Sequence, residues 1–183
     1  MPHTLIGKQA PSLSLPNYDG GIFTVNPGES GLPVVLFFYP KSGSFGCTKE
    51  ACQFRDAIAE KDTFKPAKVQ IVGLSRDPVE KQKQFVEKEK LTYPVLSDVD
   101  GKAHDEYKVG KGLLGLSDAR VTFVIDKKGV VRDVLDATVN YAAHVKFVTK
   151  LLDKLEAEEA AAPTAAATAE EPQPEATPAP ASA

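Results

Sequence analysis

The stretch LPVVLFFYPKSGSFGCTKEACQFRDAIAEKDTF, residues 32–64, joins an apolar run to a segment with helical spacing. Its first part, 32–39, is continuously apolar, β-branched and aromatic, which is typical of a strand buried on both faces. Its last part, 48–64, places small and apolar residues at helical intervals: Ala51, Phe54, Ile58 and Ala59. The stretch therefore predicts a buried strand that leads directly into an amphipathic helix.

The same alternation continues on the carboxyl side of this unit. Asp77 and Pro78 form a good N-cap and N1 pair for a helix over 78–90. The other expected segments are a strand at 67–75, a short apolar segment at 93–98, a short helix at 101–108, strands at 121–126 and 130–136, and a helix at 141–155. This order predicts an α/β fold with a central mixed β-sheet flanked by helices, parallel first and antiparallel after the hairpin.

The composition divides the chain into a folded body, residues 1–155, and a tail, residues 156–183. The tail holds six glutamates and no Lys or Arg, and is otherwise mostly Ala, Pro and Thr. It lacks the large apolar residues that offset chain entropy, so we expect it to be disordered, with helix at most over its first turn. The whole chain has a net charge of −3, whereas the body alone carries 22 basic and 19 acidic residues.

This balance excludes some classes of function. The body shows no basic patch with interleaved aromatic residues, so nucleic acid is not an expected partner. Its longest apolar run is far shorter than the roughly 20 residues of a membrane span, so no membrane association is expected. No secretory signal is expected at the N-terminus, and two cysteines are too few for a disulfide scaffold. The expected location is cytoplasmic, with the nucleus as the alternative.

Cys47 follows the predicted buried strand and lies in the first turn of the predicted helix. Unpaired N–H groups and the positive end of the helix dipole at this place favour a thiolate over a thiol. Ser44 is a plausible N-cap, and Gly43 and Gly46 let the backbone approach whatever binds over the sulfur. A reactive cysteine is therefore expected at Cys47.

Cys52, the second of the two cysteines, lies five residues later in the same helix. On an ideal helix two such Cα atoms are roughly 8–9 Å apart and about 140° apart around the axis. A disulfide needs Cα atoms within about 7 Å, so the two thiols cannot bond while the helix is intact. Spacing alone leaves two interpretations open: a second redox thiol that requires unwinding, or an inert core residue.

A metal site and a cofactor are not expected. A structural zinc site needs about four ligands, whereas His3, His104 and His144 are scattered without ligand spacing. We expect these histidines to lie on the surface rather than to act as bases.

Several of these residues together resemble the peroxiredoxin family. The signature is Pro40-x-x-x-Ser44-x-x-Cys47, and the segment GCTKEACQFRD with its C-x4-C spacing is similar to the peroxiredoxin Q, or bacterioferritin comigratory protein, subfamily. The segment RVTF at 120–123 resembles the family strand that supplies a second arginine. The resemblance covers most of residues 5–155 and implies a thioredoxin-like fold.

The resemblance also implies roles for individual residues. Cys47 would be the peroxidatic nucleophile and Cys52 the resolving thiol, joined in an intramolecular disulfide. By the same match, Pro40 would shape the pocket, the Ser44 hydroxyl would bond the thiolate, Arg120 would stabilise that thiolate and Glu50 would position an arginine. The substrates would be hydrogen peroxide and alkyl hydroperoxides, thioredoxin would be the reductant, and the chain would act as a monomer.

One departure from the subfamily lies at the mouth of the expected site. The subfamily reads Thr-Pro-Gly-Cys where this chain has Ser44, Phe45, Gly46 and Cys47. Serine keeps the hydroxyl without the rotamer restriction of threonine, and Phe45 replaces a proline suited to the first helical position. The departure leaves the expected type of reaction unchanged, whereas peroxide preference and rate do not follow from the resemblance.

Two other functions are compatible with such a fold. A thioredoxin-like disulfide oxidoreductase without peroxidase activity would carry Cys-x-x-Cys, and this chain carries Cys-x4-Cys. A binding or chaperone-like module that had lost the chemistry would lack Cys47, Ser44 or Arg120, and all three are present. The sequence therefore favours a thiol peroxidase in antioxidant defence.

Overall fold

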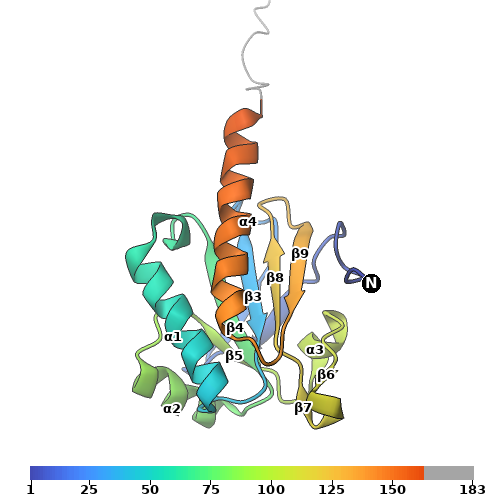
Figure 1. The fold of residues 1–183 in the computed structure, drawn as a ribbon. Coiled ribbons are helices and arrows are strands. Elements are labelled where there is room, and N and C mark those ends of the chain that lie inside the picture. The colour runs from blue at the N-terminus through green and yellow to red at the C-terminus, as the bar shows by residue number, and fades with distance from the viewer. Residues whose placement is uncertain (163–183) are drawn as a thin grey trace, which may run out of the picture.

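A computed structural model gives the fold and describes residues 1–162 (Figure 1). The strands are β1 (Leu13–Pro16), β2 (Ile22–Val25), β3 (Val34–Phe38), β4 (Gln70–Ser75), β5 (Val95–Ser97), β6 (Lys111–Gly112), β7 (Ser117–Asp118), β8 (Val121–Ile125) and β9 (Val131–Asp136). The α-helices are α1 (Phe45–Glu60), α2 (Val79–Glu89), α3 (Lys102–Glu106) and α4 (Ala142–Ala161), with short 3₁₀ turns at Asp62–Phe64 and Leu113–Gly115.

The central sheet has the strand order β5-β4-β3-β8-β9. β3 pairs with β4 in parallel and with β8 antiparallel, and β9 returns antiparallel beside β8. The predicted mixed sheet, parallel first and antiparallel after the hairpin, is confirmed. β3 occupies the middle of the sheet because its five residues are buried on both faces, as its unbroken apolar sequence requires.

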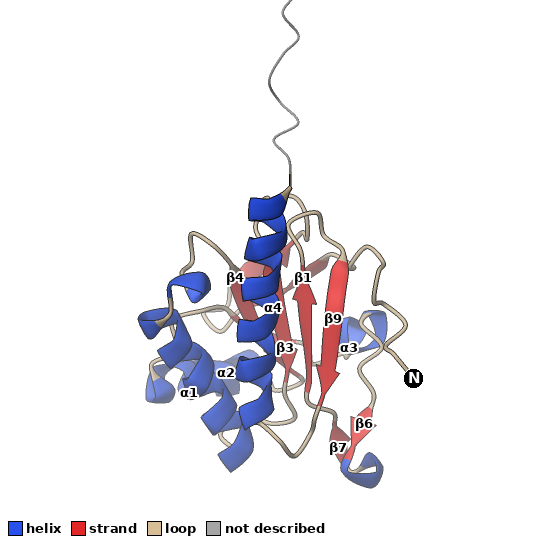
Figure 2. Cartoon of the chain, turned by 45° about the horizontal axis from the view of Figure 1, so that its top comes forward, coloured by secondary structure: helices blue, strands red, loops and turns tan. Residues whose placement is uncertain are grey.

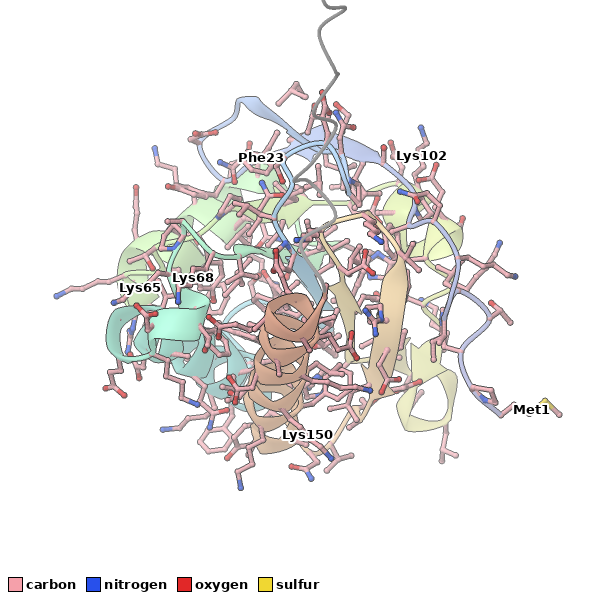
Figure 3. All side chains as sticks on the ribbon, turned by 90° about the horizontal axis from the view of Figure 1, so that it is seen from above. Met1, Phe23, Lys65, Lys68, Lys102 and Lys150 are labelled. Atoms are coloured by element: carbon pink, nitrogen blue, oxygen red, sulfur yellow. The ribbon has the colours of Figure 1, made fainter. Side chains whose placement is uncertain are left out.

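Alternate residues of β3 enter two separate hydrophobic cores. Val35 and Phe37 pack with apolar residues of α1, α2 and α4 on one face. Val34, Leu36 and Phe38 pack on the other face with α3 and the β1–β2 hairpin. Figure 2 shows α1 and α4 in front of the sheet and α3 behind it. Seen from above, Lys102 of α3 and Lys150 of α4 lie on opposite sides of the sheet (Figure 3).

Helix α1 begins earlier than the sequence predicts and ends earlier as well. It runs over Phe45–Glu60, and the rest of the predicted helix 48–64 is a separate 3₁₀ turn. Its buried face includes Ala57, whereas Ala59, which was expected on that face, is exposed. The earlier start places Cys47 at the third helical position, within the first turn.

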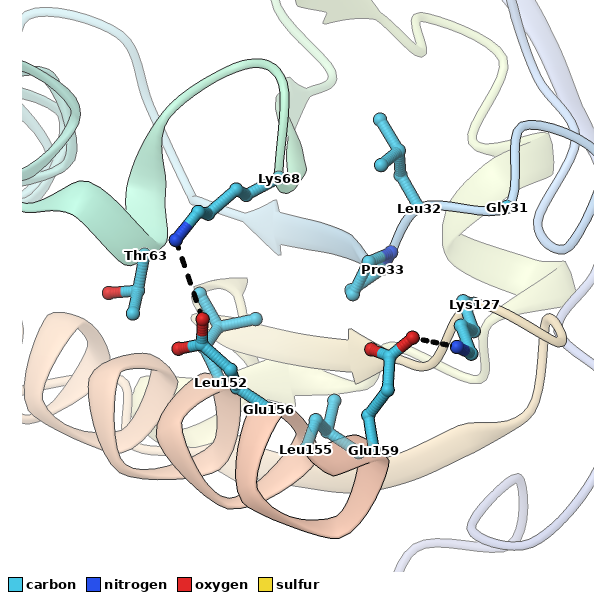
Figure 4. A pocket seen from close by; sticks show the side chains of 10 residues that line it. All are labelled: Gly31, Leu32, Pro33, Thr63, Lys68, Lys127, Leu152, Leu155, Glu156 and Glu159. Carbon is cyan, nitrogen blue, oxygen red and sulfur yellow. Dashed lines mark hydrogen bonds and ion pairs between the residues drawn. The ribbon is translucent and has the colours of Figure 1, made fainter. Parts of the chain in front are cut away.

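Helix α4 continues beyond the predicted end at residue 155, as far as Ala161. Glu156, Glu158 and Glu159 on this extension form ion pairs with Lys68, Arg132 and Lys127 respectively. The pairs of Glu156 and Glu159 border a groove beside the start of β3 (Figure 4). The first six residues of the predicted tail are thus helical, and the tail prediction for residues 163–183 lies outside the described residues. Within residues 1–162, no helix is long and apolar enough to cross a membrane.

Candidate active site

The site forms where β3 ends and α1 begins, at the lower end of the molecule in Figure 1. Cys47 lies in the first turn of α1, where N–H groups without intrahelical partners point towards the loop. The thiol is only 1% exposed and belongs to the core on the α1 face of the sheet. The core therefore buries the Cys47 sulfur, and the helix terminus supplies a positive field to it.

Arg120 reaches the site from a distant part of the sequence, where it immediately precedes β8. Its Nη2 lies 3.3 Å from the Cys47 Sγ, and its Nε donates a hydrogen bond of 3.0 Å to the Thr138 carbonyl. Only 4% of Arg120 is exposed, so its charge acts on the sulfur in a largely water-free environment. Burial by itself would lower the pKa of Arg120, but the negative charges of Glu50 and Cys47 outweigh it, and the pKa is raised.

Glu50 stands one helical turn beyond Cys47 and is fully buried. One carboxyl oxygen, Oε2, accepts a short hydrogen bond from Nη1 of Arg120. The guanidinium of Arg120 is thereby shared between a thiol and a carboxyl group. Burial raises the pKa of Glu50 to about 7, against the partial opposing effect of Arg120.

His144 completes this buried cluster from the first turn of α4. Its Nδ1 lies 3.5 Å from Oε1 of Glu50 and 2.8 Å from the hydroxyl oxygen of Thr122. Its Nε2 lies 3.1 Å from the carbonyl oxygen of Ala137. Burial lowers the pKa of His144 to about 4, so the imidazole is neutral near pH 7.

Ser44 and Pro40 lie in the loop between β3 and α1. Ser44 is the N-cap residue of α1 by position, but its side chain makes no capping hydrogen bond. Its hydroxyl instead donates to the Lys41 carbonyl at 2.9 Å, which leaves the oxygen lone pairs rather than the proton available towards the helix. Pro40 is half-buried and follows Tyr39, a core residue just beyond the end of β3.

A buried polar network fixes the same loop to the neighbouring strand and helix. The Tyr39 hydroxyl donates to Gln82 Oε1 at 2.6 Å, and the Ser42 hydroxyl donates to the same oxygen at 2.8 Å. The backbone N–H of Ser42 donates to the Asp77 carboxylate at 2.6 Å. Asp77 is therefore not the N-cap predicted for α2, where Pro78 occupies that position, because its carboxylate is used to hold the loop.

Cys52 points to a different part of the molecule. Its Sγ lies 3.6 Å from Oε2 of Glu89, at the end of α2, and the residue is partly exposed. Burial raises the pKa of the Cys52 thiol, with the nearby Glu89 carboxylate acting in the same direction. Cys47 and Cys52 are both free thiols, on different sides of one continuous helix.

The mouth of the site is apolar. Phe45 is 73% exposed and meets Tyr141 edge-on, with ring centroids 6.1 Å apart. Gly46 lies between them and the buried cluster, where an added Cβ would approach Nη2 of Arg120 to 3.2 Å. The absence of a side chain at Gly46 therefore allows Arg120 to reach Cys47.

The structure brings Cys47, Glu50 and Arg120 together and places Cys52 apart, while Ser44 and Pro40 lie in the loop that leads into α1. The expectation that the histidines lie on the surface is wrong for His104 and His144, which are fully buried. Sequence reasoning missed His144 because its role depends on where α4 packs. Thr122 could have been found from the two-residue period that puts it on the same face as Arg120.

The comparisons with known proteins agree with this geometry. The model of the AhpC/TSA family matches residues 6–134. The chain belongs to the AhpC/TSA family. Among relatives of this AhpC/TSA chain, the chloroplastic peroxiredoxin Q of Populus jackii is 37% identical over 149 residues, which cover 81% of the chain and 68% of the relative.

Two solved structures resemble this AhpC/TSA protein over most of its length. The peroxidoxin BcpB of Mycobacterium tuberculosis has a TM-score of 0.70 and 39% identity, covering 85% of this chain and 98% of its own. The bacterioferritin comigratory protein of Xanthomonas campestris has a TM-score of 0.66 and 27% identity, covering 80% and 91%. The thioredoxin-like fold of a peroxiredoxin Q is thereby confirmed.

Membership of the AhpC/TSA family, with peroxiredoxin Q relatives, makes the chain a thiol peroxidase, an oxidoreductase that reduces peroxides and draws its electrons from a thioredoxin-type reductant. A disulfide oxidoreductase without peroxidase activity is not favoured.

Proposed function

We propose that Cys47 is the peroxidatic nucleophile of this peroxidase and that Arg120 is the residue that activates it. The observation that carries the proposal is the 3.3 Å approach of the Arg120 guanidinium to a buried thiol in the first turn of a helix. A nearby guanidinium and a helix N-terminus both stabilise a thiolate, which is the nucleophilic form of cysteine. The same guanidinium is placed to stabilise charge on an oxygen that leaves the sulfur.

In the first step the Cys47 thiolate attacks the terminal oxygen of a hydroperoxide. A sulfur–oxygen bond forms, the oxygen–oxygen bond breaks, and the leaving oxygen takes a proton to become water or an alcohol. The sulfur is oxidised to a sulfenic acid and the peroxide is reduced. Both hydrogen peroxide and organic hydroperoxides fit this chemistry, and alkyl peroxide reduction is described for the Xanthomonas campestris relative.

In the second step Cys52 acts as the resolving thiol. Its sulfur attacks the sulfenic sulfur, a disulfide forms and water leaves. Because the two thiols face different sides of α1, the first turns of the helix must unwind for this step. Unwinding breaks the contacts of Arg120 with Cys47 and Glu50, together with the contact of Cys52 with Glu89.

The reductant then returns the protein to the dithiol form. A dithiol of the thioredoxin type attacks the Cys47–Cys52 disulfide, becomes oxidised itself and releases both thiols. Thioredoxin itself is the proposed electron donor. A monomer is the simplest arrangement, because both redox thiols belong to one helix. The proposed enzyme acts in the cytoplasm and uses no bound cofactor. In this arrangement Pro40 and Ser44 shape the pocket from the loop, and Glu50 orients Arg120.

The test is oxidation of the reduced protein by one equivalent of hydrogen peroxide, with Cys47→Ser and Cys52→Ser as matched variants. We expect wild type to lose both thiols and about 2 Da by intact mass, because a disulfide forms with loss of two hydrogens. Cys52→Ser should accumulate a sulfenic acid, and Cys47→Ser should remain unoxidised. A Cys47 that stays reduced for minutes in wild type would refute the peroxidatic assignment, and a disulfide-linked dimer would refute the intramolecular pairing.

A further inference from the structure

A layer of buried polar groups lies beneath the Arg120–Cys47 contact and extends to α4. It consists of Glu50, His144 and Thr122, and all three are 0% exposed. Among the described residues, Oε1 of Glu50 makes no hydrogen bond. An unbonded buried carboxyl oxygen is costly unless its charge is removed or a partner is available. The nearest such partner is Nδ1 of His144, at 3.5 Å.

The hydrogen bonds of His144 fix the position of its proton. Its Nε2 faces the Ala137 carbonyl at 3.1 Å, and since a carbonyl only accepts, this nitrogen carries the hydrogen. The neutral ring then has its lone pair on Nδ1, where the Thr122 hydroxyl donates at 2.8 Å. The same lone pair faces Glu50 Oε1. A carboxylate in this position would meet a lone pair, whereas a protonated carboxyl would meet an acceptor.

The charges in the cluster also favour a protonated Glu50 when Cys47 is a thiolate. One cation, Arg120, contacts two acids, Cys47 and Glu50, in a buried site. The charge of Glu50 also acts on Tyr93, but burial raises the pKa of Tyr93 well above its ordinary value, so this hydroxyl stays neutral. A single cation in a low-dielectric site stabilises one anion well and two poorly.

Two arrangements of the same protons are therefore in competition. In one, Cys47 is a thiol and Glu50 a carboxylate. In the other, Cys47 is a thiolate and Glu50 carries the proton on Oε1. Both have the same net charge, so the balance between them is set by local hydrogen bonds rather than by bulk pH alone.

We propose that His144 is a positioning residue that accepts the proton of Glu50 in a hydrogen bond through Nδ1 and thereby shifts the proton balance towards the Cys47 thiolate. The inference rests on the proposed role of Cys47 and adds a residue from α4 to its activation. Thr122 opposes this effect, because its hydroxyl competes with Glu50 for the same lone pair. The raised pKa of Glu50 and the lowered pKa of His144 agree with a protonated carboxyl beside a neutral imidazole.

Two substitutions of His144 separate this role from a structural one. In His144→Asn the side-chain oxygen takes the place of Nδ1 and retains an acceptor for Glu50. In His144→Gln the terminal amide takes the place of Nε2 and retains the bond to the Ala137 carbonyl, but no acceptor faces Glu50. Thr122→Val, which keeps the shape of the side chain, removes the competing donor.

The readout is the rate of Cys47 alkylation by iodoacetamide between about pH 5 and pH 9. All variants are made in a Cys52→Ser background, so that one thiol reacts. We expect His144→Gln to slow alkylation about tenfold near pH 6.5, which corresponds to one unit on the pH axis, and His144→Asn to stay within about threefold of the parent. Thr122→Val should move the profile to lower pH. Thermal unfolding of each variant reports whether it is folded.

Three outcomes overturn the inference. One is an unchanged profile in folded His144→Gln, and another is rescue by Gln but not by Asn, which would identify the Ala137 bond as the important one. The third is a Thr122→Val profile that stays in place or moves to higher pH, and this outcome decides the matter even if the His144 variants do not fold. Iodoacetamide is not a peroxide, so failure of Cys47 to reduce peroxide would refute the proposed function without changing this result.

Discussion

The two thiols of α1 are five residues apart and have opposite surroundings. Cys47 is buried beside a guanidinium at 3.3 Å, whereas Cys52 is partly exposed beside a carboxylate at 3.6 Å. The first environment stabilises a thiolate, and the second raises the pKa of the thiol. One helix thus makes two chemically different cysteines because its two faces meet different neighbours. The difference supports the proposed attack on peroxide by Cys47 and a protonated Cys52 thiol in the folded helix.

The largest expected effect comes from removing the cation on the Cys47 side. Arg120→Met should slow the reaction of Cys47 with hydrogen peroxide by about 10²–10³-fold, as for loss of one charged donor at a transition state. Stopped-flow measurement of sulfenic acid formation in the Cys52→Ser background gives the rate.

The matched control is Arg55→Met, which removes a guanidinium on the Cys52 side. The partly exposed guanidinium of Arg55 pairs with Asp56 at 2.7 Å and donates to the Glu89 carbonyl at 2.5 Å, so this change should alter the peroxide rate by less than about threefold. Equal losses in the two variants would mean that the contact with Cys47 carries no special weight.

An intermediate effect is expected on stability, because Glu50 of α1 is a fully buried acid. The pKa of Glu50 is about 7 in the fold and 4.5 in its reference state, so folding takes up a proton. The resulting stability is fully present below pH 4.5 and is lost as the pH rises through 7, by about 3 kcal/mol in total. His144 acts in the opposite direction, since its pKa is lowered to about 4, and its contribution grows as the pH rises from 4 to 6.5.

Urea unfolding of wild type and Glu50→Gln at pH 5 to 8 separates the two groups. The free energy of unfolding of Glu50→Gln should increase relative to that of wild type as the pH rises, because glutamine resembles the protonated carboxyl and does not titrate. Glu60→Gln, at an exposed position of the same helix, should give a constant difference. A constant difference for Glu50→Gln as well would show that the carboxyl is already ionised in the fold.

The smallest effect is expected at the Cys52 side. Glu89→Gln removes the carboxylate 3.6 Å from Cys52 Sγ, which should lower the pKa of that thiol and speed disulfide formation about two- to threefold at pH 7. Quenched-flow analysis of the Cys47 sulfenic acid measures this step. A slower step would indicate that Glu89 assists Cys52, for example by accepting its proton.

The sequence predicts the order of strands and helices because β3 is apolar throughout and α1 has clear helical spacing. It also predicts that Cys47, Arg120 and Glu50 belong together, since these positions match a family pattern, and the structure brings them into contact. It does not predict His144, because helical spacing alone does not tell which residue of α4 faces the sheet. The use of Asp77 was missed for a similar reason: its partner is the backbone of Ser42, 35 residues away.

The hydrogen bonds on either side of Cys47 limit how far its sulfur can travel. The Ser42 N–H is held by Asp77, and the Ala51 carbonyl accepts a hydrogen bond of 2.7 Å from Tyr93. A segment anchored at Ser42 extends at most about 17 Å to Cys47 when fully stretched. If the start of α1 unwinds, the segment between Ser42 and Ala51 is therefore a short tether with two fixed ends. In the proposed mechanism, this tether limits the oxidised sulfur of Cys47 to nearby thiols, which favours Cys52 of the same helix over thiols of other molecules.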